Sequence, residues 1–323
     1  MKSINHGDGM RSSVFLFMIA LAALVAGCGP SNPGGSSPTS GKLIVYADEI
    51  YAPLIRALAD TFMVKSPNAR VEVRPLSARK GVQSLFDSPV HDTTGADTMA
   101  TTAIVIGRKL FPDEQQASLR GGFEVNEYVI GYDGFAVVVP NGSPLHTTTM
   151  ERLRAALSGG GPAGLDSAGA GGAVRFLLTD QNSSAFAFMR SVLLHDSNVT
   201  APAQYISTSD SLLKRVAAGD GIGLLGWFAA HRDSAAVRTL AIGFTDSTRT
   251  MHPPAIIHPA SLVTGIYPMK QPLVGYTFAS SHSLAVGFLA WLSKSQDAQS
   301  YLVNHGLQGE NIKLRISMPE EGP

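Results

Sequence analysis

The body of the chain alternates short apolar runs with amphipathic segments, beginning near residue 42. Residues 42–46 form a β-branched run typical of a buried strand, while Leu54, Leu58 and Phe62 recur every four residues and share one helix face. Similar patterns predict strands at 69–75, 103–106, 135–139, 174–178, 221–225 and 237–243, and helices at 80–86, 112–119, 149–157, 185–194, 209–218 and 284–292. Strands alternating with helices indicate an α/β fold with mainly parallel sheets flanked by helices.

The N-terminal region has the pattern of a targeting segment. Residues 14–26 are uninterruptedly apolar, Arg11 precedes them, and Gly27-Cys28 follows them, which is typical of a secretory signal peptide. The run Val25–Cys28 resembles a bacterial lipobox, in which cleavage precedes the cysteine and the thiol is lipidated; a buried cysteine after an ordinary signal sequence is the alternative. We therefore predict a lipoprotein signal peptide at 1–27, starting at Met1 or Met10, and a flexible Gly/Pro/Ser-rich tether at 28–41.

The amino-acid composition argues against several classes of function. With 323 residues, 44% of them apolar, the chain can bury one large core or two medium ones. Lys+Arg and Asp+Glu both number 25, so nothing indicates a nucleic-acid partner. The single cysteine excludes a disulfide framework, the nine histidines lack a metal-site spacing, and the glycine-rich segment 159–172 precedes a strand rather than following one. No metal and no cofactor are expected.

Six segments of the body carry a family pattern. In chain order they read KLIVYADEIYAPLIRALADTF, AIVIGRKLFPDE, YDGFAVVVPNGSPL, LTDQNSSAFAFMRSVLL, GDGIGLLGW and YPMKQPL. Over about 41–316 the chain resembles the phosphate-binding subunits of bacterial phosphate ABC importers, type 2 members of the periplasmic solute-binding protein superfamily. The resemblance implies two α/β lobes, joined by a hinge of two crossover strands, that close over an anion.

The resemblance also implies a domain organisation and a function. Lobe 1 would comprise 42–131 plus 262–316, lobe 2 would comprise 132–261, and 317–323 would be a disordered tail. The protein would be a lipid-anchored, monomeric binding protein of the cell envelope, facing the periplasm or the cell exterior. It would capture phosphate or a similar oxyanion for an ABC permease complex. The alternative is a surface receptor or sensor of the same fold for a different small ligand. No nucleophile motif surrounds Ser183, so an enzyme is not expected.

Five candidate ligand residues follow from the match. Asn182, Ser183 and Ser184 precede a predicted helix, where free amides and hydroxyls can hold an oxyanion; a plain N-cap is the alternative. Arg108 follows a buried strand and has the geometry for a bidentate contact with phosphate, unless it is a solvated surface arginine. Ser77 stands where the family has a ligand serine, unless it is a turn residue.

Asp48 and Glu49 depart from the family pattern, which usually has Ser, Thr and small residues in the first ligand loop. A carboxylate there can accept the proton of a monohydrogen phosphate, or recognise a cationic or hydroxylated group. Alternatively, both acids lie in the first turn of the helix that opens near Ile50. An arginine common in the family is also absent, since Thr179 and Asp180 stand in its place.

Replacement of the lone cysteine tests the predicted lipid anchor. Because the lipid is attached through the thiol, Cys28→Ser is expected to yield a soluble or unprocessed protein. Membrane fractionation with an intact-mass measurement checks this. Recovery of the variant in the membrane fraction, with a mature mass matching the wild type apart from the substitution, would contradict the anchor.

Overall fold

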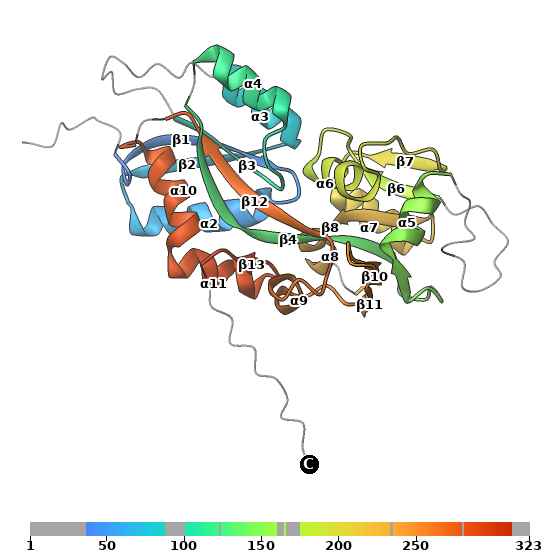
Figure 1. The fold of residues 1–323 in the computed structure, drawn as a ribbon. Coiled ribbons are helices and arrows are strands. Elements are labelled where there is room, and N and C mark those ends of the chain that lie inside the picture. The colour runs from blue at the N-terminus through green and yellow to red at the C-terminus, as the bar shows by residue number, and fades with distance from the viewer. Residues whose placement is uncertain are drawn as a thin grey trace, which may run out of the picture.

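The chain folds into two lobes that lie side by side and are joined by long strands (Figure 1). The computed structural model describes residues 37–87, 101–122, 124–159, 165, 175–232, 235–279 and 281–311. The predicted signal peptide, Cys28, most of the tether, most of the glycine-rich segment and the tail lie outside the described residues. Within the described ranges, no helix combines the length and apolar character needed to cross a membrane.

The first lobe is built on three parallel strands, with β1 between β2 and β3. Its elements are β1 (Gly41–Asp48), α2 (Ala52–Lys65), β2 (Ala69–Leu76), α3 (Ala78–Asp87), β3 (Thr101–Ile106), α4 (Pro112–Gly121), α10 (Leu284–Lys294), α11 (Gln296–Asn304) and β13 (Gln308–Gly309). Because the three strands are parallel, their carboxyl ends meet at one edge of the sheet, which faces the second lobe.

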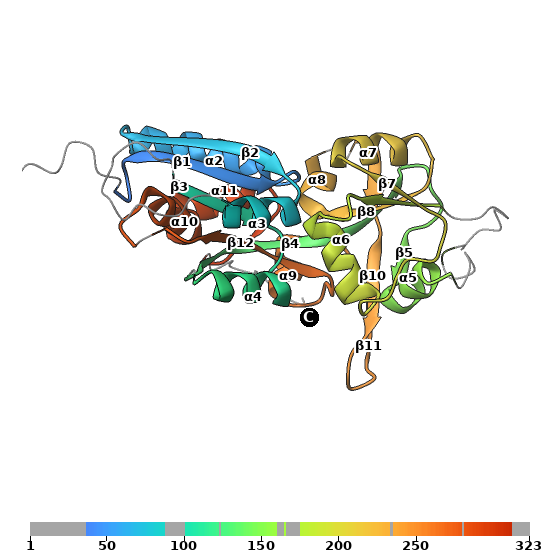
Figure 2. The same ribbon diagram turned by 90° about the horizontal axis from the view of Figure 1, so that it is seen from above.

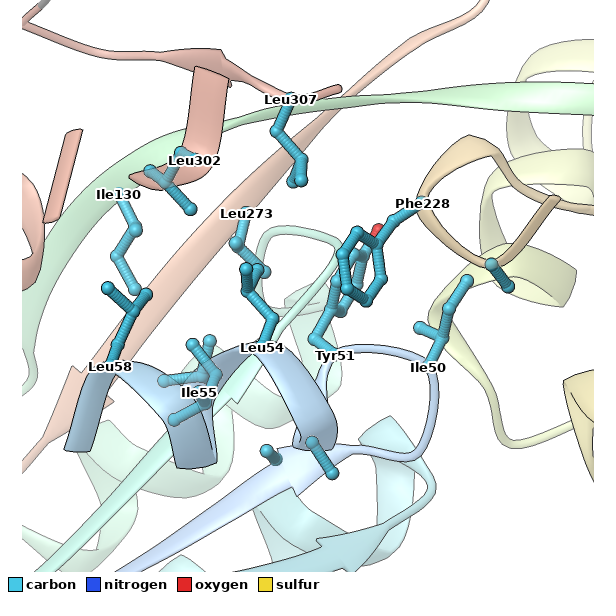
Figure 3. Packing of buried hydrophobic residues seen from close by; sticks show 14 of the residues in the cluster. Ile50, Tyr51, Leu54, Ile55, Leu58, Ile130, Phe228, Leu273, Leu302 and Leu307 are labelled. Carbon is cyan, nitrogen blue, oxygen red and sulfur yellow. The ribbon is translucent and has the colours of Figure 1, made fainter. Parts of the chain in front are cut away.

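The predicted apolar face of α2 is confirmed. Leu54, Leu58 and Phe62 are at most 3% exposed, and the helix begins with a proline in its first turn. Leu54 and Leu58 pack toward Leu273 and Ile130 of the two crossing strands (Figure 3). This core continues into the second lobe, where Phe228 lies beside Tyr51 (Figure 3).

Two strands connect the lobes, β4 (Asn126–Pro140) and β12 (Lys270–Thr277). The part of β4 up to Gly134 pairs with β12, whereas the part from Phe135 onward pairs with strands of the second lobe. The result is one continuous strand order, β2-β1-β3-β12-β4-β8-β6-β7. The sheet is therefore mixed: parallel within each lobe, and antiparallel where the crossing strands join it.

The second lobe repeats the arrangement, with β6 lying parallel to both β7 and β8. Its elements are β5 (Thr147–Thr149), α5 (Met150–Leu157), β6 (Phe176–Thr179), α6 (Ser184–Phe188), a π-helical turn (Met189–Leu193), β7 (Ala203–Ile206), α7 (Ser209–Ala217), β8 (Ile222–Gly226), α8 (Trp227–Arg232), β9 (Val237–Thr239), β10 (Ala241–Thr245), β11 (Met251–Ala255) and α9 (Pro259–Val263). Strands β11, β10 and β5 form a separate sheet.

Three predicted elements differ from the structure by more than a shift of their ends. The strand expected at 237–243 is two strands, because the chain leaves β4 at Leu240 and joins the separate sheet as β10. The helix expected at 185–194 changes from α6 to the π-helical turn at Met189. The strand expected at 135–139 is the second half of β4. The first half of β4 contains several polar residues, so its sequence lacks the apolar pattern that predicts a strand.

A glycine on the crossing strand supplies a test of this topology. A Cβ at Gly131 would lie 2.5 Å from the backbone carbonyl oxygen of Gln308 in β13, which cannot move aside without breaking the ladder. We expect Gly131→Ala to lower the free energy of unfolding by about 1–3 kcal/mol. The control is Gly142→Ala, where a Cβ meets nothing within 4 Å, with an expected change of about 0.5 kcal/mol or less. Urea denaturation measures both, and equal stability of the two variants would contradict this packing.

Candidate functional site

The candidate residues lie where the two lobes meet. β1, β2 and β3 lead at their carboxyl ends into the segments that hold Asp48-Glu49, Ser77 and Arg108, and β6 and β7 lead into α6 and α7. In parallel sheets, ligands bind beside the carboxyl ends of the strands. Figure 2 shows α3 of the first lobe and α6 of the second on either side of this boundary, where the Arg79 amide donates to the Asn182 carbonyl at 3.0 Å.

Asp48 joins the first lobe to α6. Its Oδ2 accepts a hydrogen bond from the Ser184 amide at 3.0 Å, and the Ser184 hydroxyl accepts one from the Gly107 amide at 2.9 Å. Asp48 and Ser184 are both buried. Burial raises the pKa of Asp48, although the hydrogen bonds from Ser184 and the charge of Arg108 oppose that rise.

Glu49 makes the equivalent contact with α7. Its carboxylate accepts from the Ser209 hydroxyl at 3.0 Å and from the Ser209 amide at 3.3 Å. Partial burial raises the pKa of Glu49, the bonds from Ser209 oppose this, and the nearby charges of Asp48 and Asp210 add to it. Two consecutive acids of one loop thus reach two different helices of the other lobe.

The N-termini of α6 and α7 have the same hydrogen-bonding arrangement. In each, the N-cap hydroxyl, Ser183 or Thr208, accepts from the backbone amide three residues later. The next residue, Ser184 or Ser209, has an amide that no intrahelical carbonyl can satisfy, and this amide donates to a first-lobe carboxylate. The partial positive charge of the helix end favours the carboxylate there.

Asp133 brings a third carboxylate to a helix N-terminus. It lies on β4 opposite Gln271 of β12 and accepts from the Phe228 amide of α8 at 3.1 Å. It also accepts from the Gly134 amide at 2.8 Å and from the Tyr51 hydroxyl at 2.9 Å. Because this site is fully buried, the pKa of Asp133 rises to about 7 despite these donors.

Arg108 is paired within the first lobe. Its guanidinium donates to both carboxylate oxygens of Glu114, at 2.7 and 2.8 Å, and lies 4.0 Å from the centre of the Phe111 ring. Both charged side chains are buried, so Arg108 is not a solvated surface arginine. Arg79 also donates to Glu114, at 3.0 Å. The bidentate contact expected with phosphate is made here with a carboxylate.

The remaining candidates lie at the same boundary. Ser183 is the N-cap of α6, and its hydroxyl lies 2.8 Å from the Thr179 hydroxyl. Asn182 is exposed, and its side-chain amide donates to Asp180 at 3.1 Å. The Ser77 hydroxyl is buried and has no hydrogen-bond partner among the described residues.

Two cavities open on either side of Ser183. One of about 300 Å³ holds three acids and a single lysine; it is lined by Asp48, Glu49, Ile50, Pro75, Leu76, Ser77, Lys80, Thr179, Asp180, Ser183, Ala185, Ser207 and Ser209. The other, of about 400 Å³, is lined by Arg79, Arg108, Phe111, Pro112, Asp113, Gln181, Asn182, Ser183, Phe186, Ala187, Arg190 and Asp196. Six of the seven candidates therefore line one of these cavities, and the seventh, Ser184, is fully buried. Among the residues described, no His, Cys, Asp and Glu cluster is arranged to hold a metal ion.

A family model described as the PBP superfamily domain matches residues 32–295, more than half of the chain. The chain belongs to the PBP superfamily. No curated protein matches it. Solved structures with this fold include a Clostridium perfringens protein described as a phosphate ABC transporter substrate-binding protein, with bound phosphate (TM-score 0.65, 14% identity, 83% of this chain and 99% of that chain).

Two further structures extend the comparison. An ABC-type phosphate transport receptor from Vibrio cholerae has a TM-score of 0.59 at 16% identity, covering 83% of this chain and 99% of that one. The regulatory domain of Synechocystis CcmR, in complex with 2-PG, has a TM-score of 0.51 at 12% identity, covering 78% and 96%. At identities of 12–16%, these similarities show that the chain has a two-lobed α/β fold.

One alternative for the two acids is wrong. α2 begins at Ala52 and carries no acid in its first turn, so Asp48 and Glu49 do not stabilise that helix. Sequence reasoning missed Ser209, which is the partner of Glu49, and the buried Asp133. A signal for Ser209 was present, since Ser207-Thr208-Ser209 precedes a predicted helix just as Asn182-Ser183-Ser184 does.

The raised pKa of Asp133 predicts a pH dependence of stability. Between about pH 4, where an unfolded aspartate titrates, and about pH 7, the folded PBP superfamily protein holds a proton that the unfolded chain has released. This contribution is fully present below that interval and is lost as the pH rises through it, by up to about 1.4 kcal/mol per pH unit. Asp133→Asn carries no titrating proton and should lack this slope. Urea denaturation across the interval tests it, and identical slopes for both proteins would contradict the assignment.

Proposed function

We propose that this protein is a lipid-anchored extracytoplasmic solute-binding protein that captures inorganic phosphate or a related oxyanion between its lobes. It would act as a monomer held at the cell envelope through Cys28, and would deliver the anion to the permease of an ABC importer. The observation that carries the proposal is the pair of helix N-termini at the boundary. The amides of Ser184 and Ser209 both point at carboxylate oxygens from the opposite lobe.

These contacts support an oxyanion as the ligand class. Carboxylate and phosphate oxygens have the same requirement: when they leave water, each needs hydrogen-bond donors. The boundary offers such donors from both lobes: amides at Ser184 and Ser209, and hydroxyls at Ser77 and Ser183. The phosphate bound in the Clostridium perfringens relative adds support from the same fold.

The arrangement supports binding rather than catalysis. The Ser183 hydroxyl lies against Thr179 and accepts from the Phe186 amide, and the Ser184 hydroxyl accepts from Gly107. Neither serine has a described hydrogen bond to a histidine that would act as a general base.

A second candidate is a receptor or sensor for a cationic or hydroxylated ligand. The cavity of about 300 Å³ favours it, since Asp48, Glu49 and Asp180 line that space against the single positive charge of Lys80. The CcmR regulatory domain has the same fold, which supports a sensory use of such a cavity.

Thermal stabilisation by ligands separates the two candidates. We expect phosphate or arsenate to stabilise the protein by about 2.7 kcal/mol when present at 100 times the dissociation constant. Sugars, amino acids and polyamines should have no such effect. Stabilisation by an amine or a polyol alone would contradict the oxyanion proposal and favour the second candidate.

Loss of a donor at α6 gives a residue-level test. Ser183→Ala removes a hydroxyl that lines both cavities, and should weaken phosphate binding by about 1–3 kcal/mol. The control is Ser191→Ala on the exposed side of the π-helical turn, whose hydroxyl donates only to the Phe188 carbonyl. Calorimetry with equal phosphate affinity in both variants would reduce Ser183 to a helix cap.

A further inference from the structure

Every side chain of the loop from Asp48 to Tyr51 contacts the second lobe. Asp48 accepts from Ser184, and Glu49 accepts from Ser209. Ile50 lies against Gly226, and Tyr51 donates to Asp133 and packs beside the Phe228 ring (Figure 3). Four consecutive residues therefore bridge the boundary between the lobes.

The loop fits between the lobes because two positions, Gly226 of the second lobe and Gly107 of the first, lack side chains. A Cβ at Gly226 would lie 2.6 Å from the Ile50 side chain, and a Cβ at Gly107 would lie 2.7 Å from the Tyr51 ring and 3.1 Å from Ser184. A Cβ at Gly226 would force the Ile50 side chain to shift, and a Cβ at Gly107 would force the Tyr51 ring to shift. The loop therefore packs closely against both lobes at these two glycines.

The acids of this loop take donors that a dissolved oxyanion would use. The Ser184 amide already donates to one oxygen of Asp48, and the Ser209 amide is shared between the two oxygens of Glu49. An oxyanion at the same place would also face two like charges. Binding of the anion and docking of the acids therefore exclude one another.

We propose that Asp48 and Glu49 are tethered anions that occupy the oxyanion positions of the second lobe, so that a dissolved oxyanion binds there only by displacing them. This rests on the proposed function, and it makes the two acids the residues that determine affinity and selectivity. Displaced carboxylates would share the cavity that also holds Lys80, a cation that offsets part of their charge.

The same contacts make the loop a clasp that holds the lobes together without any solute. Separating the lobes breaks the bonds from Ser184 and Ser209, whose energy is highest when the acceptors carry full charge. Neutral acceptors of the same shape should weaken the clasp without removing the loop. The distance between the lobes in anion-free solution therefore shows how firmly the clasp holds them together.

The test compares two pairs of substitutions that change the net charge equally. Asp48→Asn with Glu49→Gln neutralises the clasp and keeps its shape. Asp60→Asn with Glu124→Gln neutralises two exposed acids that have no described partner. We measure inorganic phosphate affinity by calorimetry, and the radius of gyration by small-angle scattering in phosphate-free buffer.

The clasp variant should bind phosphate about tenfold more tightly or better, equivalent to about 1.4 kcal/mol, and should be the more expanded protein before phosphate is added. The control pair should match the wild type in both measurements. If the isosteric pair fails to fold, Asp48→Asn alone and Glu49→Gln alone are measured, and each should show part of both effects.

Three outcomes separate this proposal from the proposed function. Unchanged affinity and unchanged dimensions would overturn the clasp and leave the two acids as helix caps. Weaker phosphate binding in the clasp variant would also overturn it, because the acids would then be partners of the ligand. Expansion of the variant with no phosphate binding by any protein would support the clasp while overturning the oxyanion as the ligand.

Discussion

A carboxylate that leaves water needs hydrogen-bond donors, and the second lobe supplies them at the N-termini of three helices. Asp48, Glu49 and Asp133 meet the amides of Ser184, Ser209 and Phe228 at the starts of α6, α7 and α8, respectively. No basic side chain of these helices has a described contact with the three carboxylates. The relative position of the lobes is thus set by backbone dipoles of one lobe and acids of the loop and strand that face it.

This constraint organises the charges around the site. Arg108, which is positioned to neutralise an anion, is matched by Glu114, and Glu114 is shared with Arg79. The positive charge that a binding site for a dianion would use is therefore largely balanced inside the first lobe. What remains for a solute is a set of hydroxyls and amides together with two cations, Lys80 and Arg190, one in each cavity.

Most of the fold could be predicted from the sequence, because periodicity reflects local burial. The strand at 42–46 and the helix face of Leu54, Leu58 and Phe62 follow from apolar spacing alone, and the structure confirms them. The first half of β4 could not be predicted in this way, since its polar and aromatic residues pair with β12, far along the chain. Pro272 likewise makes β12 a poor strand by pattern, although it sits in the ladder opposite Tyr132.

The site was less predictable, because its contacts are tertiary. Asp48 and Glu49 stood out as charges where small residues were expected, yet nothing in the sequence says that they reach α6 and α7. The Arg108–Glu114 pair depends on the turn that brings Phe111 beneath the guanidinium. Asp133 is conspicuous only once β4 and β12 are seen to pair, because its burial is produced by that crossing.

The passage of β4 through both sheets also bears on how the molecule comes apart. One core cluster runs from Leu54 and Leu58 in the first lobe to Leu177 and Leu225 in the second, and the strand between them is continuous. Each lobe also has a smaller core cluster of its own, but both lobes share the continuous strand and the cluster that follows it from one lobe into the other. Denaturation is therefore expected to be a single all-or-none event, in which the two lobes share one cooperative unit and neither survives as a folded intermediate.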